Sequence, residues 1–330
     1  MNKWIYMLAT TALLSCGNSG GSQTPAEPQV QPAAVVSSST PFNADSAYQY
    51  VAQQVAFGPR VPNTEAHKAC ARFLASELER HGAQVFVQEA IVKAYDDTPL
   101  EIQNIIGSFN PEQKERLMLF AHWDSRPYAD AEPNPKDQRS PIDGADDGAS
   151  GVGVLLEIAR QLGQKAPNIG VDILFFDAED YGRPDFVKNY KPDTWCLGTQ
   201  FWAKNPHVAD YTARFGILLD MVGAKDAVFY KEYTSMRYAA RYVDMVWEKA
   251  RNLGYGKYFI NGEGGAVTDD HQYVISGRNI PCLDIINYDP ETEKGFAEHW
   301  HTHNDNIKII NRETLHAVGH TVLDIVYEQK

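Results

Sequence analysis

Six short apolar runs constrain the fold of this 330-residue chain more than any other feature of its sequence. Several of them contain almost no polar residues, whereas a strand with one face in water alternates polar and apolar side chains. The runs lie at residues 84–92, 102–108, 117–121, 171–176, 215–219 and 280–286. Helical patterns accompany them at residues 151–162, 235–253 and 311–327. Buried strands that alternate with helices predict a single α/β domain with a mostly parallel central sheet flanked by helices.

Two further helices are predicted ahead of the first apolar run. Asn43 is a residue type that caps a helix N-terminus. The apolar face of this first helix consists of Ala47, Tyr48, Val51 and Val55. The segment 57–62 contains Gly and two prolines and ends that helix, Thr64 opens the second helix, and Gly82 ends it.

The N-terminus has the features of an export signal. Lys3 supplies a positive charge, and residues 4–14 form an apolar run that is too short to span a bilayer as a helix. The run ends in Leu13-Leu14-Ser15-Cys16, which resembles a bacterial lipobox. Residues 1–16 are therefore predicted to be a lipoprotein signal peptide, with Cys16 lipidated as the first residue of the mature protein. An ordinary signal peptide, in which Cys16 has no role, is the alternative.

Residues 17–41 are predicted to be a flexible tether between the anchor and a folded domain at 42–330. The tether segment is rich in Gly, Ser, Gln, Pro and Ala, and such a composition buries too little apolar surface to fold. We expect an exported lipoprotein in the periplasm or at the outer membrane, attached to the membrane only through Cys16. The net charge of −13 disfavours phosphate backbones and anionic lipid surfaces, so nucleic acid is not an expected partner.

The cysteines of the predicted mature chain do not form a disulfide framework. Beyond Cys16 there are three, Cys70, Cys196 and Cys282, and they are widely spaced. One pair can bridge in an oxidising compartment, and the sequence does not identify which. Their spacing does not match a cysteine zinc site, and Cys282 lies in an apolar run, which favours a place in the core.

Polar side chains follow three of the predicted strands at the point where each strand ends. The run 117–121 continues into His122 and Asp124, the run 171–176 into Asp177, Glu179 and Asp180, and the run 215–219 into Asp220. Open α/β sheets place their sites beyond the carboxyl ends of the strands, so these side chains are expected to share one pocket.

Two further segments supply metal-binding residue types. An acidic turn at residues 143–147 precedes the helical pattern at 151–162, and a run at 299–303 contains three histidines. A catalytic zinc needs three protein ligands and one open position, and nitrogen and oxygen ligands suffice when no cysteines are suitable. Asp147, Asp180 and His301 are predicted to supply them. Glu179, next to Asp180, is then placed to exchange a proton with the substrate.

An ordered set of motifs makes the chain resemble the zinc aminopeptidase family that also contains the animal-type glutaminyl cyclases. The set spans nearly the whole of residues 42–330. It comprises Phe57-Gly-Pro-Arg-Val-Pro62, Asn104-Ile-Ile-Gly107, His122-Trp-Asp-Ser125, Gly144-Ala-Asp-Asp147, Phe175-Phe-Asp-Ala-Glu-Asp180, Leu219-Asp220, Asp269-Asp-His271 and Trp300-His-Thr302. The resemblance implies that residues 42–330 form a zinc-dependent catalytic domain.

The resemblance implies two alternatives for the metal. The peptidases of this family hold two zincs: Asp147 would bridge them, and Asp180 and His301 would hold one. His122 and Asp220 would hold the other. The cyclases resemble one another in binding a single zinc, and we expect one Zn²⁺ per chain here.

Three features favour the cyclases over the peptidases. Trp300 directly precedes the zinc histidine, and Phe296 lies four residues ahead of Trp300. The third feature is the doubled Asp269-Asp270, with Val267 at the matching apolar position. The expected function is therefore cyclisation of N-terminal glutamine on peptides and proteins to pyroglutamate, with release of ammonia. A two-zinc aminopeptidase and an inactive lipoprotein that binds N-termini are the alternatives.

The cyclase resemblance assigns a role to each residue of the predicted pocket. Glu179 would take a proton from the substrate's α-amine and pass it to the leaving ammonia. Asp220 and Asp269 would hydrogen-bond the tetrahedral intermediate. The side chains expected to wall the substrate pocket are Trp300, Phe296, Val267 and, as a weaker match to a second pocket tryptophan, Trp195.

The chain departs from the animal cyclases at two positions. They have Glu where this chain has the metal ligand Asp180, and either carboxylate can bind zinc. They also have a His where this chain has Asp284. Whether Asp284 joins a proton relay behind Asp269 is left open by the sequence.

Overall fold

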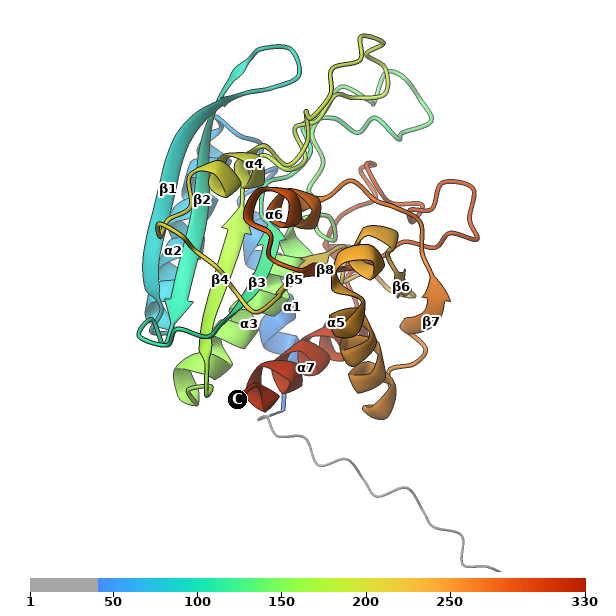
Figure 1. The fold of residues 1–330 in the computed structure, drawn as a ribbon. Helices are drawn as coiled ribbons and strands as arrows, with labels where there is room; N and C mark the ends of the chain where they lie inside the picture. The colour runs from blue at the N-terminus through green and yellow to red at the C-terminus, as the bar shows by residue number, and fades with distance from the viewer. Residues whose placement is uncertain (1–40) are drawn as a thin grey trace, which may run out of the picture. The chain divides into compact units, whose positions relative to one another are not determined.

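The computed structural model describes residues 41–330 (Figure 1). The predicted signal peptide, the lipidated Cys16 and all of the predicted tether except Pro41 lie outside the described residues. In chain order the helices are α1 (Ala44–Ala56), α2 (Glu65–Arg80), α3 (Ala149–Gln164), α4 (Leu197–Lys204), α5 (Tyr233–Asn252), α6 (Asp270–Arg278), the 3₁₀ helix η1 (Ile307–Ile309) and α7 (Arg312–Glu328).

A six-stranded sheet forms the centre of the domain. Its strands are β1 (Gln84–Lys93), β2 (Pro99–Phe109), β3 (Arg116–His122), β4 (Gly170–Phe176), β5 (Gly216–Asp220) and β8 (Cys282–Ile286). The order across the sheet is β1-β2-β4-β3-β5-β8. The β4–β3, β3–β5 and β5–β8 pairs are parallel, whereas β2 pairs antiparallel with both β1 and β4. All six predicted strands are present, and the prediction of a mostly parallel sheet is confirmed.

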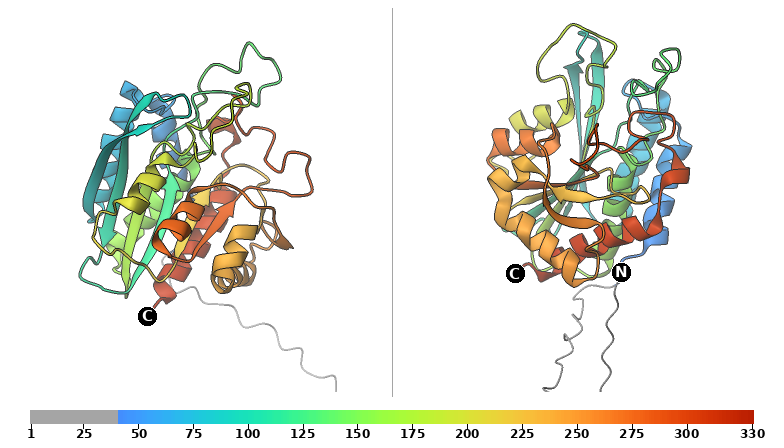
Figure 2. Two further views of the ribbon diagram at one scale, coloured as in Figure 1. Left: turned by 45° about the horizontal axis from the view of Figure 1, so that its top comes forward. Right: turned by 90° about the vertical axis from the view of Figure 1, so that its right-hand side faces the viewer.

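Helices cover both faces of this sheet, as predicted (Figure 2). On one face α1 packs on α3, which contacts β3 and β5, and α2 lies against β1 and β2. On the other face α4 packs on α6, and the two contact β2, β5 and β8. Trp202 of α4 and Val274 of α6 belong to this second core, together with Phe120 and Phe176 of the sheet. The α4 and α6 helices were not predicted, nor was the two-stranded sheet of β6 (Phe229–Lys231) and β7 (Phe259–Glu263).

The first helices begin and end where the sequence indicates. The side chain of Asn43 accepts a hydrogen bond from the Ser46 N–H at 3.1 Å, and that of Thr64 accepts one from the His67 N–H at 3.2 Å. These bonds satisfy N–H groups that a helix N-terminus leaves without partners. Gly82 follows α2 with φ 89°, a conformation that glycine adopts without a Cβ penalty.

A close contact between α3 and β5 brings two parts of the predicted site together. A Cβ atom at Gly151 would lie 2.2 Å from the carbonyl oxygen of Leu219, so only glycine permits this approach. Asp147 stands just before α3 and Asp220 ends β5. The glycine therefore lets the acidic turn before α3 approach the carboxyl end of β5.

Cys70, Cys196 and Cys282 are buried and free, so none of them pairs with another in the described part of the chain. The possibility of a bridge between two of them is therefore not realised, while the prediction of a core position for Cys282 is correct. None of the helices between residues 41 and 330 is long and apolar enough to cross a bilayer.

Candidate active site

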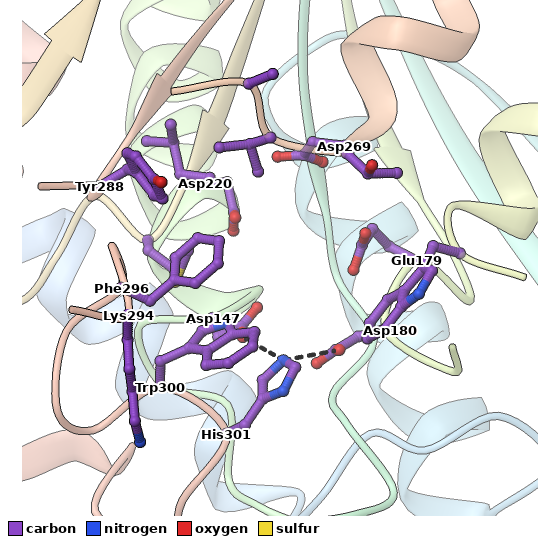
Figure 3. A pocket seen from close by; sticks show the side chains of 16 residues that line it. Asp147, Glu179, Asp180, Asp220, Asp269, Tyr288, Lys294, Phe296, Trp300 and His301 are labelled. Atoms are coloured by element: carbon purple, nitrogen blue, oxygen red, sulfur yellow. Dashed lines mark ion pairs between the residues drawn. The ribbon is translucent and has the colours of Figure 1, made fainter. Parts of the chain in front are cut away.

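The ends of β4 and β5 meet at one pocket with a cavity volume of about 310 Å³ (Figure 3). His122, Asp124 and Asp177, which the sequence predicts to share it, do not line this pocket, and Asp177 pairs with His67 instead. Glu179 and Asp180 follow β4, Asp220 ends β5, and His301 lies in the loop between β8 and η1. All ten residues predicted for the site line this pocket: Asp147, Glu179, Asp180, Trp195, Asp220, Val267, Asp269, Phe296, Trp300 and His301. The sequence analysis missed six further lining residues, which are Met221, Ala266, Thr268, Ile286, Tyr288 and Lys294.

The three predicted metal ligands converge at the floor of the pocket. His301 Nε2 lies 3.3 Å from Asp180 Oδ1 and 3.7 Å from Asp147 Oδ2 (Figure 3). All three side chains are buried, and Asp180 Oδ2 has no hydrogen-bond partner among residues 41–330. Burying two carboxylates next to an imidazole, with one carboxylate oxygen left unbonded, costs folding free energy that a bound cation would offset. The donor set of one nitrogen and two carboxylates therefore fits a zinc ion with an open position.

A buried ion pair orients His301, the predicted zinc ligand. His301 Nδ1 lies 3.2 Å from Asp130 Oδ1, and Arg126 donates to both oxygens of Asp130 at 2.6 Å. Burial acts to raise the pKa of Asp130, but Arg126 and His301 outweigh it and hold that pKa well below its usual value. Arg126 also donates to the carbonyl oxygen of Asp180 at 2.9 Å and to its Oδ1 at 3.2 Å. One guanidinium thus fixes the positions of two predicted metal ligands.

Two further buried carboxylates hold the loops that carry the acidic ligands. Asp124 accepts hydrogen bonds from the backbone N–H groups of Glu179 and Asp180, both at 3.1 Å. Asp305 accepts from the N–H groups of Asp146 at 2.7 Å and of Asp147 at 3.1 Å. Each carboxylate therefore fixes the backbone of a loop whose side chains face the pocket.

The three histidines of the run at 299–303 have separate surroundings. Of the three, only His301 faces the predicted ligands Asp147 and Asp180. Its backbone adopts φ 53°, a conformation that few non-glycine residues adopt. His299 Nε2 lies 3.0 Å from Asp146 Oδ2, while His303 is exposed beside Glu132. The run taken alone gave no reason to prefer one of the three histidines.

A second group of potential metal ligands adjoins the first. His122 Nε2 lies 3.0 Å from Asp147 Oδ1 and 3.2 Å from Asp220 Oδ1. The three residues are buried, and their ligand atoms lie within 4.8 Å of one another. Because Asp147 belongs to both groups, this is the arrangement that the two-zinc alternative requires.

The predicted proton shuttle, Glu179, and the predicted hydrogen-bonding residues, Asp269 and Asp220, are buried carboxyls that line the pocket, and Glu179 lies across it from Trp300 (Figure 3). Burial raises the pKa of Glu179 well above its usual value, and the Asp269 and Asp180 carboxylates raise it further. Burial likewise raises the pKa of Asp269 strongly and that of Asp220 to about 6. Asp269 Oδ1 accepts from the N–H of Asp270, whereas its Oδ2 is buried without a partner in the described structure. Such groups are suited to accept and return protons near neutral pH.

Aromatic rings form the apolar wall of the pocket. Trp300 stacks on Phe296 with ring centroids 4.5 Å apart and on His301 with centroids 3.6 Å apart. Val267 belongs to the same apolar cluster. The Trp195 ring lies nearly parallel to that of His301 at 6.1 Å. Apolar rings on two sides of a buried acidic floor leave room for one short side chain.

Asp284 lies behind Asp269, on the buried strand β8. The ligand atoms of Asp269, His271 and Asp284 lie within 4.8 Å of one another, and Asp284 Oδ2 is 3.7 Å from His271 Nδ1. Burial raises the pKa of Asp284 well above its usual value, and the neighbouring Asp269 carboxyl raises it further. His271 Nε2 in turn lies 3.1 Å from Glu232 Oε2.

The model of peptidase family M28 matches residues 104–326 of the chain. This chain belongs to peptidase family M28. A solved structure of a Zn-dependent exopeptidase from Parabacteroides distasonis is 70% identical, with a TM-score of 0.87, and the match covers 88% of this chain and 99% of that one. Glutaminyl cyclase from Tannerella forsythia is 67% identical, with a TM-score of 0.87 and coverage of 88% and 100%.

A curated relative gives a more distant match to this M28 chain. Bovine glutaminyl-peptide cyclotransferase is 28% identical over 242 residues, which is 64% of this chain and 62% of the bovine protein. The chain thus matches somewhat less than two thirds of the length of that relative. The predicted fold class and the predicted membership of the zinc aminopeptidase family are confirmed, and bacterial glutaminyl cyclases are among the similar structures.

Proposed function

We propose that this M28 protein is a zinc-dependent glutaminyl-peptide cyclotransferase. The single observation that carries the proposal is the stack of Phe296, Trp300 and His301, which places an aromatic wall directly beside the predicted metal ligands. A pocket of this kind suits the side chain of one N-terminal glutamine better than a general peptide. The 67% identity to a bacterial glutaminyl cyclase supports the same substrate, namely peptides and proteins with N-terminal glutamine.

The proposed reaction closes a ring within the substrate. The α-amine nitrogen attacks the side-chain amide carbon, a new C–N bond forms, and the bond from that carbon to the amide nitrogen breaks to release ammonia. Because both reacting groups belong to one residue, holding them in contact supplies much of the acceleration. Zinc held by Asp147, Asp180 and His301 supplies Lewis acidity toward the amide oxygen.

The protein's own carboxyls move the proton in this reaction. Glu179 takes a proton from the attacking amine and delivers it to the leaving nitrogen, a transfer suited to a carboxyl whose pKa is raised by burial. Asp269 Oδ2 and the carboxyl of Asp220 accept hydrogen bonds from the intermediate or donate them to it. The rings of Trp300 and Phe296 form an apolar wall that limits the access of water.

We further propose that the working enzyme holds one zinc. The nucleophile of the cyclase reaction is the substrate's own amine, so a metal-bound hydroxide is not required. A second ion at His122 and Asp220 would compete for that amine. The group of His122, Asp147 and Asp220 is nevertheless the observation that favours the alternative function, a two-zinc aminopeptidase in which Glu179 activates a water molecule.

Comparing two peptides tests the function directly. Purified protein is incubated with a Gln-initiated and a Leu-initiated peptide, and ammonia and free amino acid are measured. We expect ammonia release from the first and little leucine from the second, with activity lost to a chelator and restored by zinc. Efficient release of leucine by a protein with two tightly bound zincs would contradict the cyclase function and support the aminopeptidase function. If zinc-loaded protein acts on neither peptide, the remaining alternative is an inactive lipoprotein that binds N-termini.

The place of the enzyme in the cell is also a proposal. The apolar run that ends at Cys16 supports export and lipidation, with residues 17–41 linking the anchor to the catalytic domain. The protein would then act on exported peptides and proteins in the periplasm or at the outer membrane.

A further inference from the structure

A buried cysteine contacts the predicted proton shuttle. The thiol of Cys196 donates a hydrogen bond to Glu179 Oε1, with the sulfur 3.2 Å from that oxygen. No other hydrogen bond joins the Glu179 side chain to any residue between 41 and 330, so Oε2 is left unbonded. The carboxylate lines the pocket, whereas Cys196 does not (Figure 3). The only hydrogen-bond donor to this carboxylate in the described protein therefore approaches it from outside the pocket.

We propose that Cys196 is a positioning residue, whose thiol holds one oxygen of Glu179 and leaves the other directed at the substrate's amine. The inference rests on the proposed function, because it concerns the same proton transfer. A carboxylate without a fixed partner rotates freely about its last side-chain bond, and only part of that rotation serves proton transfer. One hydrogen bond at Oε1 reduces this freedom and orients Oε2.

The backbone fixes Cys196 against the loop that carries Glu179. The N–H of Cys196 donates to the Glu179 carbonyl at 2.9 Å, and the N–H of Leu197 donates to that of Ala178 at 3.0 Å. The N–H of Gly198 donates to the Asp177 carbonyl at 2.9 Å. A Cβ atom at Gly198 would lie 2.2 Å from that same carbonyl oxygen, so the close pairing of the two segments requires glycine there. The sulfur is therefore presented to Glu179 by a rigid frame.

The chemistry of the thiol suits a donor and not a nucleophile or a metal ligand. Cys196 is fully buried, and burial raises the pKa of its thiol well above the usual value, with the Glu179 and Asp270 charges raising it further. The sulfur thus keeps its proton, which a nucleophile or a zinc ligand would have lost. An ionised carboxylate only accepts hydrogen bonds, so the neutral S–H beside it serves as the donor.

Two substitutions at Cys196 separate hydrogen bonding from packing. Cys196→Ala removes the hydrogen-bond donor, while Cys196→Ser keeps a donor of similar size. Because Cys196 has φ 54°, any backbone strain caused by a side chain at this position is present in the wild type and in both variants. With a Gln-initiated peptide we expect kcat to fall about 5-fold or more in the alanine variant. KM and zinc content should stay close to those of the wild type, and the serine variant should recover most of the lost turnover.

A double-mutant cycle with Glu179→Gln then tests whether Cys196 acts through Glu179. If it does, Cys196→Ala has little further effect on turnover once the carboxylate is gone. Unchanged turnover in Cys196→Ala, an equal loss in the alanine and serine variants, or the same loss in the Glu179→Gln background would each overturn the proposal.

Vibrational spectroscopy tests the hydrogen bond without measuring turnover and without the Cys196→Ala variant. The S–H stretching band of Cys196 is identified as the band that Cys196→Ser lacks. We expect it to shift to higher frequency in Glu179→Ala, because the acceptor is removed. A band that does not move means that there is no hydrogen bond, and the proposal is then wrong. Absence of ammonia release by wild-type protein would instead count against the cyclase function and leave this spectroscopic result standing.

Discussion

Asp130 and the two predicted acidic metal ligands lie on opposite sides of the His301 ring. Asp130 Oδ1 is 3.2 Å from Nδ1, while Nε2 faces Asp147 and Asp180. A carboxylate that accepts the Nδ1 proton fixes the tautomer in which Nε2 is free to bind a metal, and it increases the basicity of that nitrogen. Asp130 is therefore expected to contribute to zinc affinity without touching the metal.

Substitution of Asp130 tests this role. In Asp130→Asn we expect zinc affinity to fall about 10- to 100-fold, because the ring loses a charged partner while the shape of the site is kept. Affinity is measured by competition with a coloured chelator. Asp137→Asn, on the exposed loop nearby, serves as the control and should bind zinc like the wild type. Equal zinc affinities in Asp130→Asn and wild type would show that Asp130 does not contribute to zinc binding through His301.

Glu179 is expected to be needed for turnover and not for metal binding. Glu179→Gln keeps the size of the side chain but cannot accept the amine proton, so turnover should fall about 10²-fold or more. Zinc content and thermal unfolding should match the wild type, because the three predicted ligands are untouched. A variant with near-normal ammonia release would remove Glu179 from the mechanism.

The number of zincs can be decided by comparing two histidine substitutions. Metal is counted by mass spectrometry of the purified protein. If a single zinc is held by His301 and two carboxylates, His122→Phe keeps about one zinc per chain and His301→Phe loses it. Wild-type protein with two zincs, falling to one in His122→Phe, would show that the second group of ligands is also a metal site.

Glu232 should make the stability of the domain dependent on pH. Burial acts to raise the pKa of Glu232, but hydrogen bonds from His271 and from the Ser235 and Thr234 N–H groups outweigh it and lower the pKa from 4.5 to about 2. Because the folded-state pKa lies below the unfolded one, the stabilisation is complete above about pH 4.5 and is lost as the pH falls toward 2.

The size of this effect is about 3 kcal/mol, since each unit of pKa shift corresponds to about 1.4 kcal/mol. The free energy of unfolding is measured by denaturant titration of zinc-free protein between pH 7 and pH 3. In Glu232→Gln it should be lower at pH 7 and should fall less between these values than in the wild type. Glu263→Gln, on the exposed side of β7, should keep the wild-type dependence. Parallel curves for wild type and Glu232→Gln would contradict the prediction.

Cys16 should determine where the protein is found after cell fractionation. Cys16→Ser removes the sulfur that lipidation requires, so the protein should leave the membrane fraction or remain unprocessed. Mass spectrometry of the wild-type N-terminus is the second measurement. A mature protein that begins elsewhere and carries no lipid would show that the alternative, an ordinary signal peptide, is correct.

Several structural elements could not be predicted because their sequences lack a repeating pattern. In α6 the apolar residues Tyr273, Val274 and Ile275 are contiguous, whereas a helix with one buried face spaces them by three or four positions. The helix is stable because Val274 packs into a core with Phe120 and Phe176, which lie on other elements. Strands β6 and β7 are three and five residues long, too short for alternation to be recognised.

The sequence by itself determined the six strands of the central sheet and the ten predicted lining residues. Strands β3, β4, β5 and β8 are buried on both faces and therefore need continuous apolar runs, whereas β1 is largely exposed. The polar residues that follow the buried strands, such as Asp180 and Asp220, emerge at the carboxyl edge of the sheet. These are local patterns, so they are visible without knowledge of the fold. The sequence predicts His301 as a zinc ligand in combination with Asp147 and Asp180, because a catalytic zinc needs three protein ligands.

Only the tertiary structure decided which groups support those side chains. Asp130 reaches His301, Asp305 reaches the turn before α3, and Cys196 reaches Glu179. Some of these partners are more than a hundred residues apart in the chain, and a single Asp or Cys in a loop carries no signal of what it will contact. The physical reason is that a hydrogen bond depends on the meeting of two side chains in space, which the order of the strands β2-β4-β3-β5-β8 brings about and no local pattern records.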